Sequence, residues 1–422
     1  MEKQFIYLDH AATTALRPQA LEAMLPFLRE SYGNASAIYS LGSQAKIALE
    51  DARAVLAKSI GAEPSEIFFT SGGTESDNWA LIAAAEAQRE KGRHIVTSAV
   101  EHHAVLRTCE YLRGRGFEIT LLPVDREGRV DPARAEAALR PDTILLSVMA
   151  ANNEVGTVQP VAELAEAARR HGVLFHTDAV QAYGKTDLSV REIPVDLLSA
   201  SAHKIGGPKG IGFLYVRRGL RLGAYQRGGM QERGRRAGTE NVAGAVGFAA
   251  AVTEAFALRV AEEEREAALQ RYFVQRMRER IPDAVLNGVP VDPVDAEPDG
   301  EMAADGAVFA GREHGDGAPG TALREEPVRR LRQNLNFSIP GVDAEAALIM
   351  LDMRGICASG GSACTTGAIE PSHVLTAMGL TASEARGALR FTLGEENTRE
   401  QIEETVCALA QIAEQLRRTG GH

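Results

Sequence analysis

Short apolar runs alternate with helical patterns between about residues 60 and 220, and this alternation constrains the fold more than any other feature of the chain. The stretch 161–172, "VAELAEAARRHG", has a helical period and ends on a glycine, a common helix stop. Strands and helices in alternation are typical of a mostly parallel sheet covered by helices on both faces. We therefore expect an α/β domain. Its strands are predicted at 66–71, 94–99, 143–149, 173–179, 195–201 and 210–216.

The remainder of the chain predicts a second, smaller domain of the α+β type. A long alanine-rich and charged pattern at 244–280 suits one or two helices that link the domains. Strand patterns at 334–339 and 388–394 then alternate with helical patterns at 343–352 and near the C-terminus. A chain of 422 residues is also too long for one compact core.

These patterns set the expected domain boundaries. We expect a large domain at 15–262 and a small domain made of 1–14 and 263–422. The stretch 289–328 is rich in Pro, Gly and acidic residues and has no hydrophobic period. Such a composition predicts a disordered insertion within the small domain.

Composition excludes several classes of protein. The 46 basic and 57 acidic residues give a net charge of −11, so no broad basic surface predicts binding to nucleic acid or to an anionic membrane. We see no apolar run long enough to span a bilayer and no signal-peptide pattern at the N-terminus. Together with only four cysteines, this favours a reducing cytoplasm. Neither Cys-x-x-Cys nor His-Glu-x-x-His occurs, so no metal site is expected.

A lysine stands out in "SASAHKIGGPKG" at 199–210. Lys204 follows a predicted strand and precedes a glycine-rich turn, at the strand end where α/β sheets place their ligands. Most lysines in loops are simply exposed to solvent. A fixed and partly desolvated lysine at such a place is instead suited to forming a Schiff base.

Polar residues mark four further strand ends. "FFTSGGTESDNWA" predicts a strand, a glycine turn and a helix, whose free N–H groups and Thr74 hydroxyl suit a phosphate. Asp178 either caps a helix or pairs with a protonated pyridine nitrogen. His102 is either structural or stacks on an aromatic cofactor. With "AANNEVGT" at 150–157, these ends together favour one shared site.

Eight motifs taken in order resemble the NifS/IscS-type cysteine desulfurases, which are fold-type I pyridoxal-phosphate enzymes of aminotransferase class V. The resemblance covers nearly the whole chain apart from 289–328 and the last few residues. It implies a seven-stranded, mostly parallel sheet flanked by helices in the large domain. The motifs are "YLDHAATT", "TSGGTESDN", "EHHAV", "NNEVGTVQP", "HTDAVQ", "SAHKIGGPKGIGFLYV", "GGMQERGRRAGTENV" and "SGGSACTTG".

The resemblance also implies a role for each matching residue. Lys204 would hold pyridoxal 5'-phosphate covalently, with Asp178 facing the pyridine nitrogen and Gln181 the phenolic oxygen. His102 would stack on the ring, and Asn153 would lie beside it. Arg390 would bind the carboxylate of L-cysteine, with Asn34 nearby. The phosphate would be held by Gly73, Thr74, Ser201 and His203, and by Thr239 from the second subunit of a homodimer.

Cys364 would accept the sulfur, leaving a persulfide on the enzyme and L-alanine as product. It lies among glycines, serine and threonines, which suit a tether that moves between a buried cofactor and an outside partner. That partner would be a protein: an iron–sulfur scaffold, a tRNA-thiolation relay or another carrier. The other three cysteines, Cys109, Cys357 and Cys407, lie in strand-like or helical patterns and are expected to be packed.

Two other functions remain open at this point. A selenocysteine lyase or another β-eliminating enzyme of this fold would carry a similar residue set. A binding protein that has lost turnover is disfavoured, because it would not need Lys204, Asp178, His102, Arg390 and Cys364 together. The chain departs from the family pattern at His10, often Asn, at "GNASA" (33–37), and in lacking the longer C-terminal tail with which housekeeping members hold a scaffold.

Overall fold

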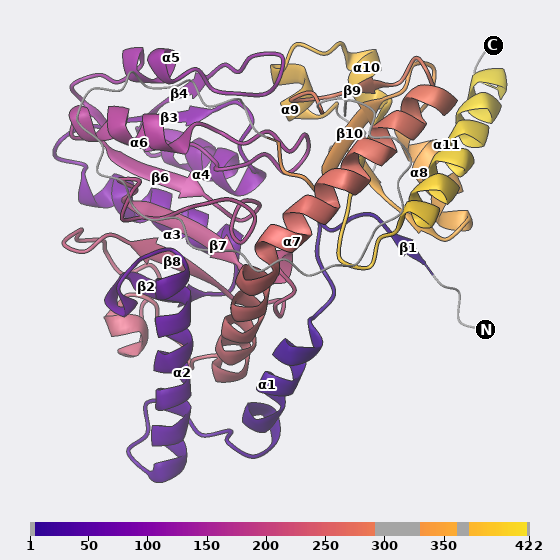
Figure 1. The fold of residues 1–422 in the computed structure, drawn as a ribbon. Coiled ribbons are helices and arrows are strands. Elements are labelled where there is room, and N and C mark those ends of the chain that lie inside the picture. The colour runs from indigo at the N-terminus through magenta and orange to yellow at the C-terminus, as the bar shows by residue number, and fades with distance from the viewer. Residues whose placement is uncertain (1–4, 292–329, 361–370, 420–422) are drawn as a thin grey trace, which may run out of the picture.

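A seven-stranded sheet forms the centre of the larger part of the molecule (Figure 1). The computed structural model describes residues 5–291, 330–360 and 371–419. Neighbouring strands are parallel throughout β7-β6-β5-β3-β4, whereas β8 runs antiparallel to both β2 and β7. In spatial order the strands are β2 (Ile67–Thr70), β8 (Gly212–Val216), β7 (Leu197–Ser201), β6 (Leu174–Asp178), β5 (Thr143–Ser147), β3 (His94–Ser98) and β4 (Glu118–Leu122).

Helices cover both faces of this sheet, as the alternating pattern predicts. In β8, Phe213 and Tyr215 pack into one apolar core, while Leu214 and Val216 pack into another on the opposite face. The first core takes in α2 (Ser40–Ser59), α6 (Val161–Arg170) and the start of α7 (Val242–Arg280), and the second takes in α3 (Gly73–Ala87) and α4 (His103–Arg113). The remaining helical elements of this part are α1 (Pro18–Arg29), α5 (Pro132–Ala137), η1 (Pro64–Glu66), η2 (Ala202–Lys204) and η3 (Gln231–Gly234).

A third apolar core forms the smaller part of the molecule. It packs around the antiparallel sheet β12-β13-β10-β9, beside which β1 and β11 pair in parallel. These strands are β1 (Ile6–Tyr7), β9 (Val285–Leu286), β10 (Asn334–Ser338), β11 (Ile356–Cys357), β12 (Ser359–Gly360) and β13 (Ala388–Thr392). The helices are α8 (Ala344–Met353), α9 (His373–Ala377), α10 (Ala382–Arg386) and α11 (Arg399–Thr419).

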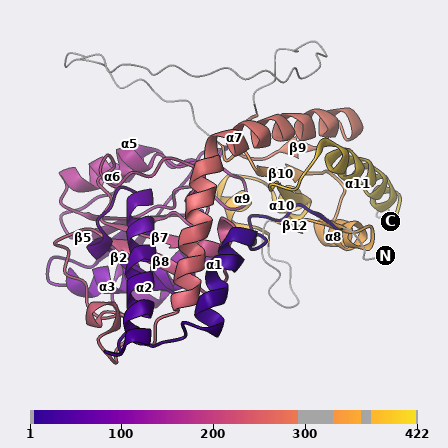
Figure 2. The ribbon, with the colours of Figure 1, turned by 60° about the horizontal axis from the view of Figure 1, so that its bottom comes forward.

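Helix α7 joins the two parts (Figure 2). Phe248 and Val252, in its first half, belong to the large core, whereas Leu269, Phe273 and Met277 belong to the small one. We propose that the domain boundary lies inside this helix, near residue 262.

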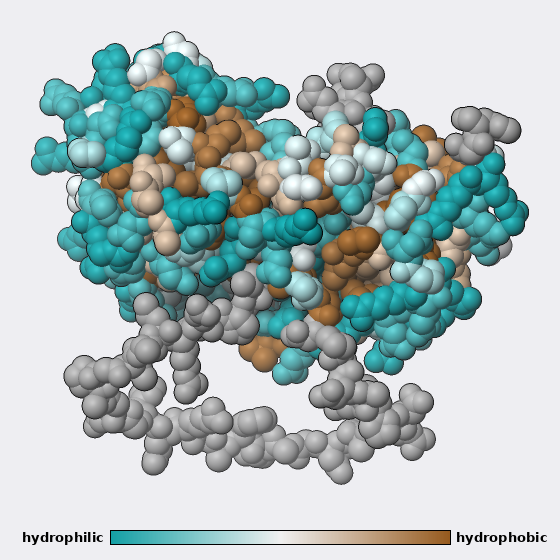
Figure 3. Space-filling model, turned by 90° about the horizontal axis from the view of Figure 1, so that it is seen from above, coloured by the Kyte–Doolittle hydropathy of each residue, from teal (hydrophilic) through white to brown (hydrophobic). Residues whose placement is uncertain are grey.

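Two expectations need correction. The sequence predicts no membrane-spanning run, yet α7 is long and apolar enough by length and composition alone to cross a membrane. Many of its apolar side chains pack in the two cores, although Leu258 and Val260 are exposed. On the face seen in Figure 3 apolar residues form separate patches within a hydrophilic surface. The insertion expected at 289–328 begins later, because Val289 and Val291 are buried. The rest of it lies outside the described residues.

A buried ion pair fixes the segment at η3 to the large domain. The guanidinium of Arg53, on α2, donates two hydrogen bonds of 2.8 Å each to the carboxylate of Glu232. That carboxylate also accepts from the N–H of Phe69 at 3.0 Å, and both charged side chains are 3% exposed. Glu232 has a φ of 45°, so its contacts hold a backbone shape that side-chain-bearing residues rarely adopt.

Replacing Glu232 by Gln should therefore lower the free energy of unfolding by about 3 kcal/mol, because it leaves the buried Arg53 charge with only the half-exposed Glu50 as counter-charge. Urea unfolding followed by circular dichroism measures the change. Glu50→Gln is the matched control: Glu50 also contacts Arg53 but is half exposed, and its loss should cost less than about 1 kcal/mol. Equal losses in the two variants would contradict this account.

Candidate active site

A cavity of about 350 Å³ opens at the edge of the large sheet where β2, β3, β5, β6 and β7 end. The small domain closes part of it with Arg390 from β13 and with Ser359 and Gly360 from β12. Ten residues that the sequence marks as functional line this one cavity: Gly73, Thr74, His102, Asn153, Asp178, Gln181, Ser201, His203, Lys204 and Arg390.

Lys204 lies on the short turn η2, directly after β7. Its Nζ donates to the backbone carbonyl oxygens of Ala11 at 2.6 Å and Ala12 at 2.8 Å. Burial, followed by the nearby charge of Arg390, lowers the pKa of this amine from 10.5 to about 8. About a tenth of Lys204 is therefore neutral at pH 7, far more than of an ordinary lysine, and the neutral form is the one that a nucleophile or base requires.

The N-terminus of α3 forms the end of the cavity suited to a phosphate. Gly72, the residue before the helix, has a φ of 152° and provides no side-chain cap, so the first N–H groups of a 15-residue helix remain available. A Cβ on Gly73 would come within 2.5 Å of Val180 Cγ2, so only glycine fits there. The hydroxyl-bearing residues Thr74 and Ser201 line the same end. These groups fit a phosphate.

Asp178 ends β6 at the base of the cavity and is 4% exposed. It accepts a hydrogen bond from the N–H of Val180 at 2.9 Å. Burial raises the pKa of its carboxyl, while the positive charges of His102 and Lys204 oppose the rise. A buried carboxyl of this kind fits a cationic partner such as a protonated pyridine nitrogen.

Asp77, which the sequence did not single out, lies beside Asp178. It is 1% exposed, and its Oδ1 is 3.6 Å from His176 Nε2. Burial, and then the charge of Asp178, raises the pKa of Asp77 well above its usual range. Its place in "TSGGTESDN", one turn beyond Gly73, puts a polar residue on the buried face of a helix. That is the signal by which it could have been found.

His102 completes this end of the cavity. Its Nδ1 accepts from the N–H of Ala104 at 3.1 Å, which orients the ring, and burial lowers its pKa. The donor atoms of Asp77, His102 and Asp178 lie within 4.8 Å of one another, so the three could also hold a metal ion. We propose that they serve the cofactor instead, because the phosphate cradle and Lys204 share the cavity.

Arg390 occupies the opposite side of the cavity. Its Nη2 contacts Asp9 Oδ1 at 2.7 Å, and its Nη1 donates to the carbonyl of Asn153 at 3.1 Å. The buried Nε has no partner among the described residues. An amino-acid carboxylate bound here would supply that missing acceptor.

Two predicted residues that the structure describes, Asn34 and Thr239, are not brought into the cavity within one chain. Asn34 is exposed and accepts from the N–H of Ser36 at 2.8 Å, and Thr239 is exposed after η3. Neither lines the cavity. Cys364 lies outside the described residues. The strand that precedes it does reach the site, since Ser359 is paired with Arg390 across β12 and β13.

Comparison with known proteins identifies the family. The aminotransferase class-V family matches residues 6–295 and 316–405. The chain belongs to this family. It is 46% identical to the cysteine desulfurase IscS of Dictyoglomus turgidum, over 98% of this chain and 96% of that protein. It is 43% identical to the cysteine desulfurase IscS of Methanosarcina thermophila, over 99% of this chain and 94% of that protein.

Solved structures of similar proteins agree. A NifS-like protein superposes with a TM-score of 0.83 at 34% identity, covering 97% of this chain and 99% of its own. SspA in complex with cysteine superposes with a TM-score of 0.72 at 32% identity, covering 92% of this chain and 98% of its own. The chain is thus a pyridoxal-phosphate-dependent cysteine desulfurase of the NifS/IscS type, and the expected fold, activity and cofactor are confirmed.

Covalent loading of the apoprotein with pyridoxal phosphate should follow the deprotonation of Lys204. Because the pKa of this amine is lowered from 10.5 to about 8, the loading rate should rise from pH 7 to pH 9 and level off above it. Absorbance of the bound cofactor measures the rate, with Lys204→Ala as the variant that forms no covalent link. A rate that keeps rising towards pH 10 would show that the site does not lower this pKa.

Proposed function

We propose that this cysteine desulfurase uses Lys204 as base and Cys364 as sulfur acceptor to convert L-cysteine into L-alanine. The observation that carries the proposal is the single cavity lined by Lys204, Asp178, Arg390 and the α3 N-terminus. Gly360, the last described residue before the segment that holds Cys364, lines it as well. A relative solved with cysteine supports the choice of substrate.

The chain's own residues divide the work as follows. Arg390 orients the substrate carboxylate, and the neutral Lys204 amine removes the proton from the α-carbon and returns one to the product. When bound, the cofactor supplies an electron sink for the carbon that loses its proton. Asp178 stabilises positive charge on the ring nitrogen, while His102 holds or moves a proton beside it.

Sulfur transfer balances without an added oxidant. The Cys364 thiolate attacks the substrate sulfur, so a sulfur–sulfur bond forms as the carbon–sulfur bond breaks. The electron pair stays on the former Cβ, which takes up a proton to become the alanine methyl group. One cysteine and one thiol thus give alanine and one enzyme persulfide. We propose a cytoplasmic protein acceptor for it, such as an iron–sulfur scaffold or a thiolation carrier.

Cys364→Ser should retain bound cofactor but release alanine at least about a hundredfold more slowly, because it lacks the acceptor for the sulfur. After brief exposure of wild-type protein to cysteine, peptide mass spectrometry should find one added sulfur on the peptide that contains Cys364. Cys357→Ala is the control and should remain active within about twofold, since Cys357 is partly buried on β11 rather than in the cavity. A persulfide on Cys357 together with a fully active Cys364→Ser would overturn the assignment.

We also propose a homodimer with composite active sites. Large apolar side chains are unusually exposed between residues 21 and 47, around α1 and the start of α2, where they would suit a contact with a second copy. The site is incomplete in one chain if Thr239 contributes to it, because Thr239 lies outside the cavity of its own chain. The exposed side chains are Leu21, Leu28, Tyr32, Ile38, Tyr39 and Ile47.

A charge introduced into this surface should weaken the dimer and the activity together. We expect Ile38→Asp combined with Tyr32→Asp to shift sedimentation towards monomer and to reduce alanine release at low protein concentration. Leu121→Asp is the matched control, because Leu121 is also exposed but lies on the edge strand β4. Fully active monomers of the double variant would contradict the composite site.

A further inference from the structure

An N-terminal strap, residues 9–17, holds the backbone of the turn that carries Lys204. The N–H of Thr14 donates to the carbonyl of His203 at 2.9 Å, and the Thr14 hydroxyl accepts from the N–H of Gly206 at 2.8 Å. The N–H of Arg17 donates to the carbonyl of Gly206, also at 2.8 Å. The strap therefore satisfies backbone groups on both sides of Lys204.

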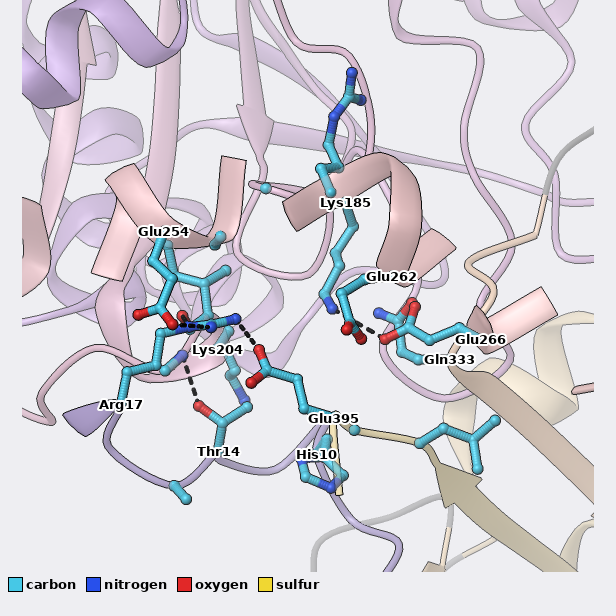
Figure 4. Close-up of a pocket in the computed structure, with 18 of the residues that line it drawn as sticks. His10, Thr14, Arg17, Lys185, Lys204, Glu254, Glu262, Glu266, Gln333 and Glu395 are labelled. Atoms are coloured by element: carbon cyan, nitrogen blue, oxygen red, sulfur yellow. Dashed lines mark hydrogen bonds and ion pairs between the residues drawn. The ribbon is translucent and has the colours of Figure 1, made fainter. Parts of the chain in front are cut away.

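The side chain of Arg17 makes the most extensive of these contacts (Figure 4). Its Nε donates to the carbonyl of Ile205 at 3.1 Å, its Nη1 lies 3.4 Å from Glu254 Oε1 on α7, and its Nη2 forms an ion pair with Glu395. The side chain is 11% exposed. Gly206 has a φ of 80°, and a Cβ there would come within 2.5 Å of Arg17 Cγ. Arg17 is thus packed directly against the Lys204 turn.

The same strap contacts the strand that supplies Arg390. Asp9 Oδ1 lies 2.7 Å from Arg390 Nη2, and the N–H of Ala11 donates to Thr392 Oγ1 at 2.8 Å. Glu395 follows β13 by three residues. One side chain, Arg17, therefore connects the end of the substrate-binding strand to the carbonyl next to Lys204.

Arg17 also lines a second cavity, of about 180 Å³, which Lys204 shares with the first. Glu254, Glu395 and His10 lie on its wall, and Figure 4 shows Arg17 between the two glutamates. The Lys204 turn thus separates two cavities rather than resting on solid packing. A turn in that position depends on its few direct contacts to keep its place.

We propose that Arg17 is a positioning residue. Its contacts to Ile205 and Glu395 keep the Lys204 turn at a fixed position relative to β13. The inference rests on the proposed function, since it assumes that Lys204 performs the proton transfer. Glu395 is half exposed, so its ion pair contributes little by charge alone. The hydrogen bond to the Ile205 carbonyl and the packing on Gly206 carry most of the effect.

Arg17→Met tests the proposal, because Met keeps much of the side-chain volume but removes the donors and the charge. We expect kcat for alanine release to fall about tenfold, while the KM for cysteine stays within about twofold. Amide hydrogen exchange of the peptide spanning 203–207 should become faster in the apoprotein. This second measurement does not depend on bound cofactor or on turnover.

Further variants define how Arg17 acts. Arg17→Lys should recover only part of kcat, because an ammonium cannot reproduce the fork that reaches Ile205 and two carboxylates. Glu395→Gln should give a smaller loss than Arg17→Met, and the double variant should lose no more than Arg17→Met alone. The control is Asp187→Asn, which breaks the 2.7 Å ion pair with Arg259 at the wall of the same cavity without touching the strap. It should leave kcat and exchange unchanged.

The outcomes separate this inference from the proposed function. If wild-type protein releases no alanine from cysteine, the proposed function is wrong. If wild-type protein is active and Arg17→Met matches it in kcat and in exchange at 203–207, the positioning role is wrong. A loss of kcat with unchanged exchange, or a loss that Asp187→Asn reproduces, would equally overturn it.

Discussion

The common direction of the parallel strands is the constraint on which the site depends. Strands β3, β5, β6 and β7 end at the same edge of the sheet, so the residues that follow them meet there although they are far apart in the sequence. Backbone hydrogen bonding sets this arrangement, and the two covering layers of helices prevent the sheet from exposing its apolar faces. Each strand end can then place a polar side chain at the cavity instead of in the apolar core.

Burial gives these polar residues their chemistry. Removing water lowers the pKa of Lys204 and raises the pKa values of Asp77 and Asp178, so each group is pushed towards its neutral form. The free protein thus holds an amine ready to react and carboxyls that gain from a cationic partner. A cofactor that brings an aldehyde, a basic ring nitrogen and a phosphate would provide a partner for each of these groups.

Much of this could be predicted from the sequence, because strand ends and glycine turns leave strong local patterns. Lys204, Asp178 and His102 each follow an apolar run, and the structure places all three in one cavity. Asp77 follows no apolar run, and its one signal was its place one turn beyond Gly73; which face of α3 is buried depends on the fold. The contacts of Arg17 were equally hidden, because its partners lie about 190 and 380 residues along the chain and only the fold brings them together.

Helix α7 has a consequence for how the molecule loses its structure. Its 39 residues form a rod of about 58 Å whose two halves are embedded in different cores. If either core unfolded, the apolar residues on one half of this continuous helix would be exposed to water. The two domains are therefore expected to unfold in one transition. Removing either domain would expose the apolar residues of α7 that pack against it.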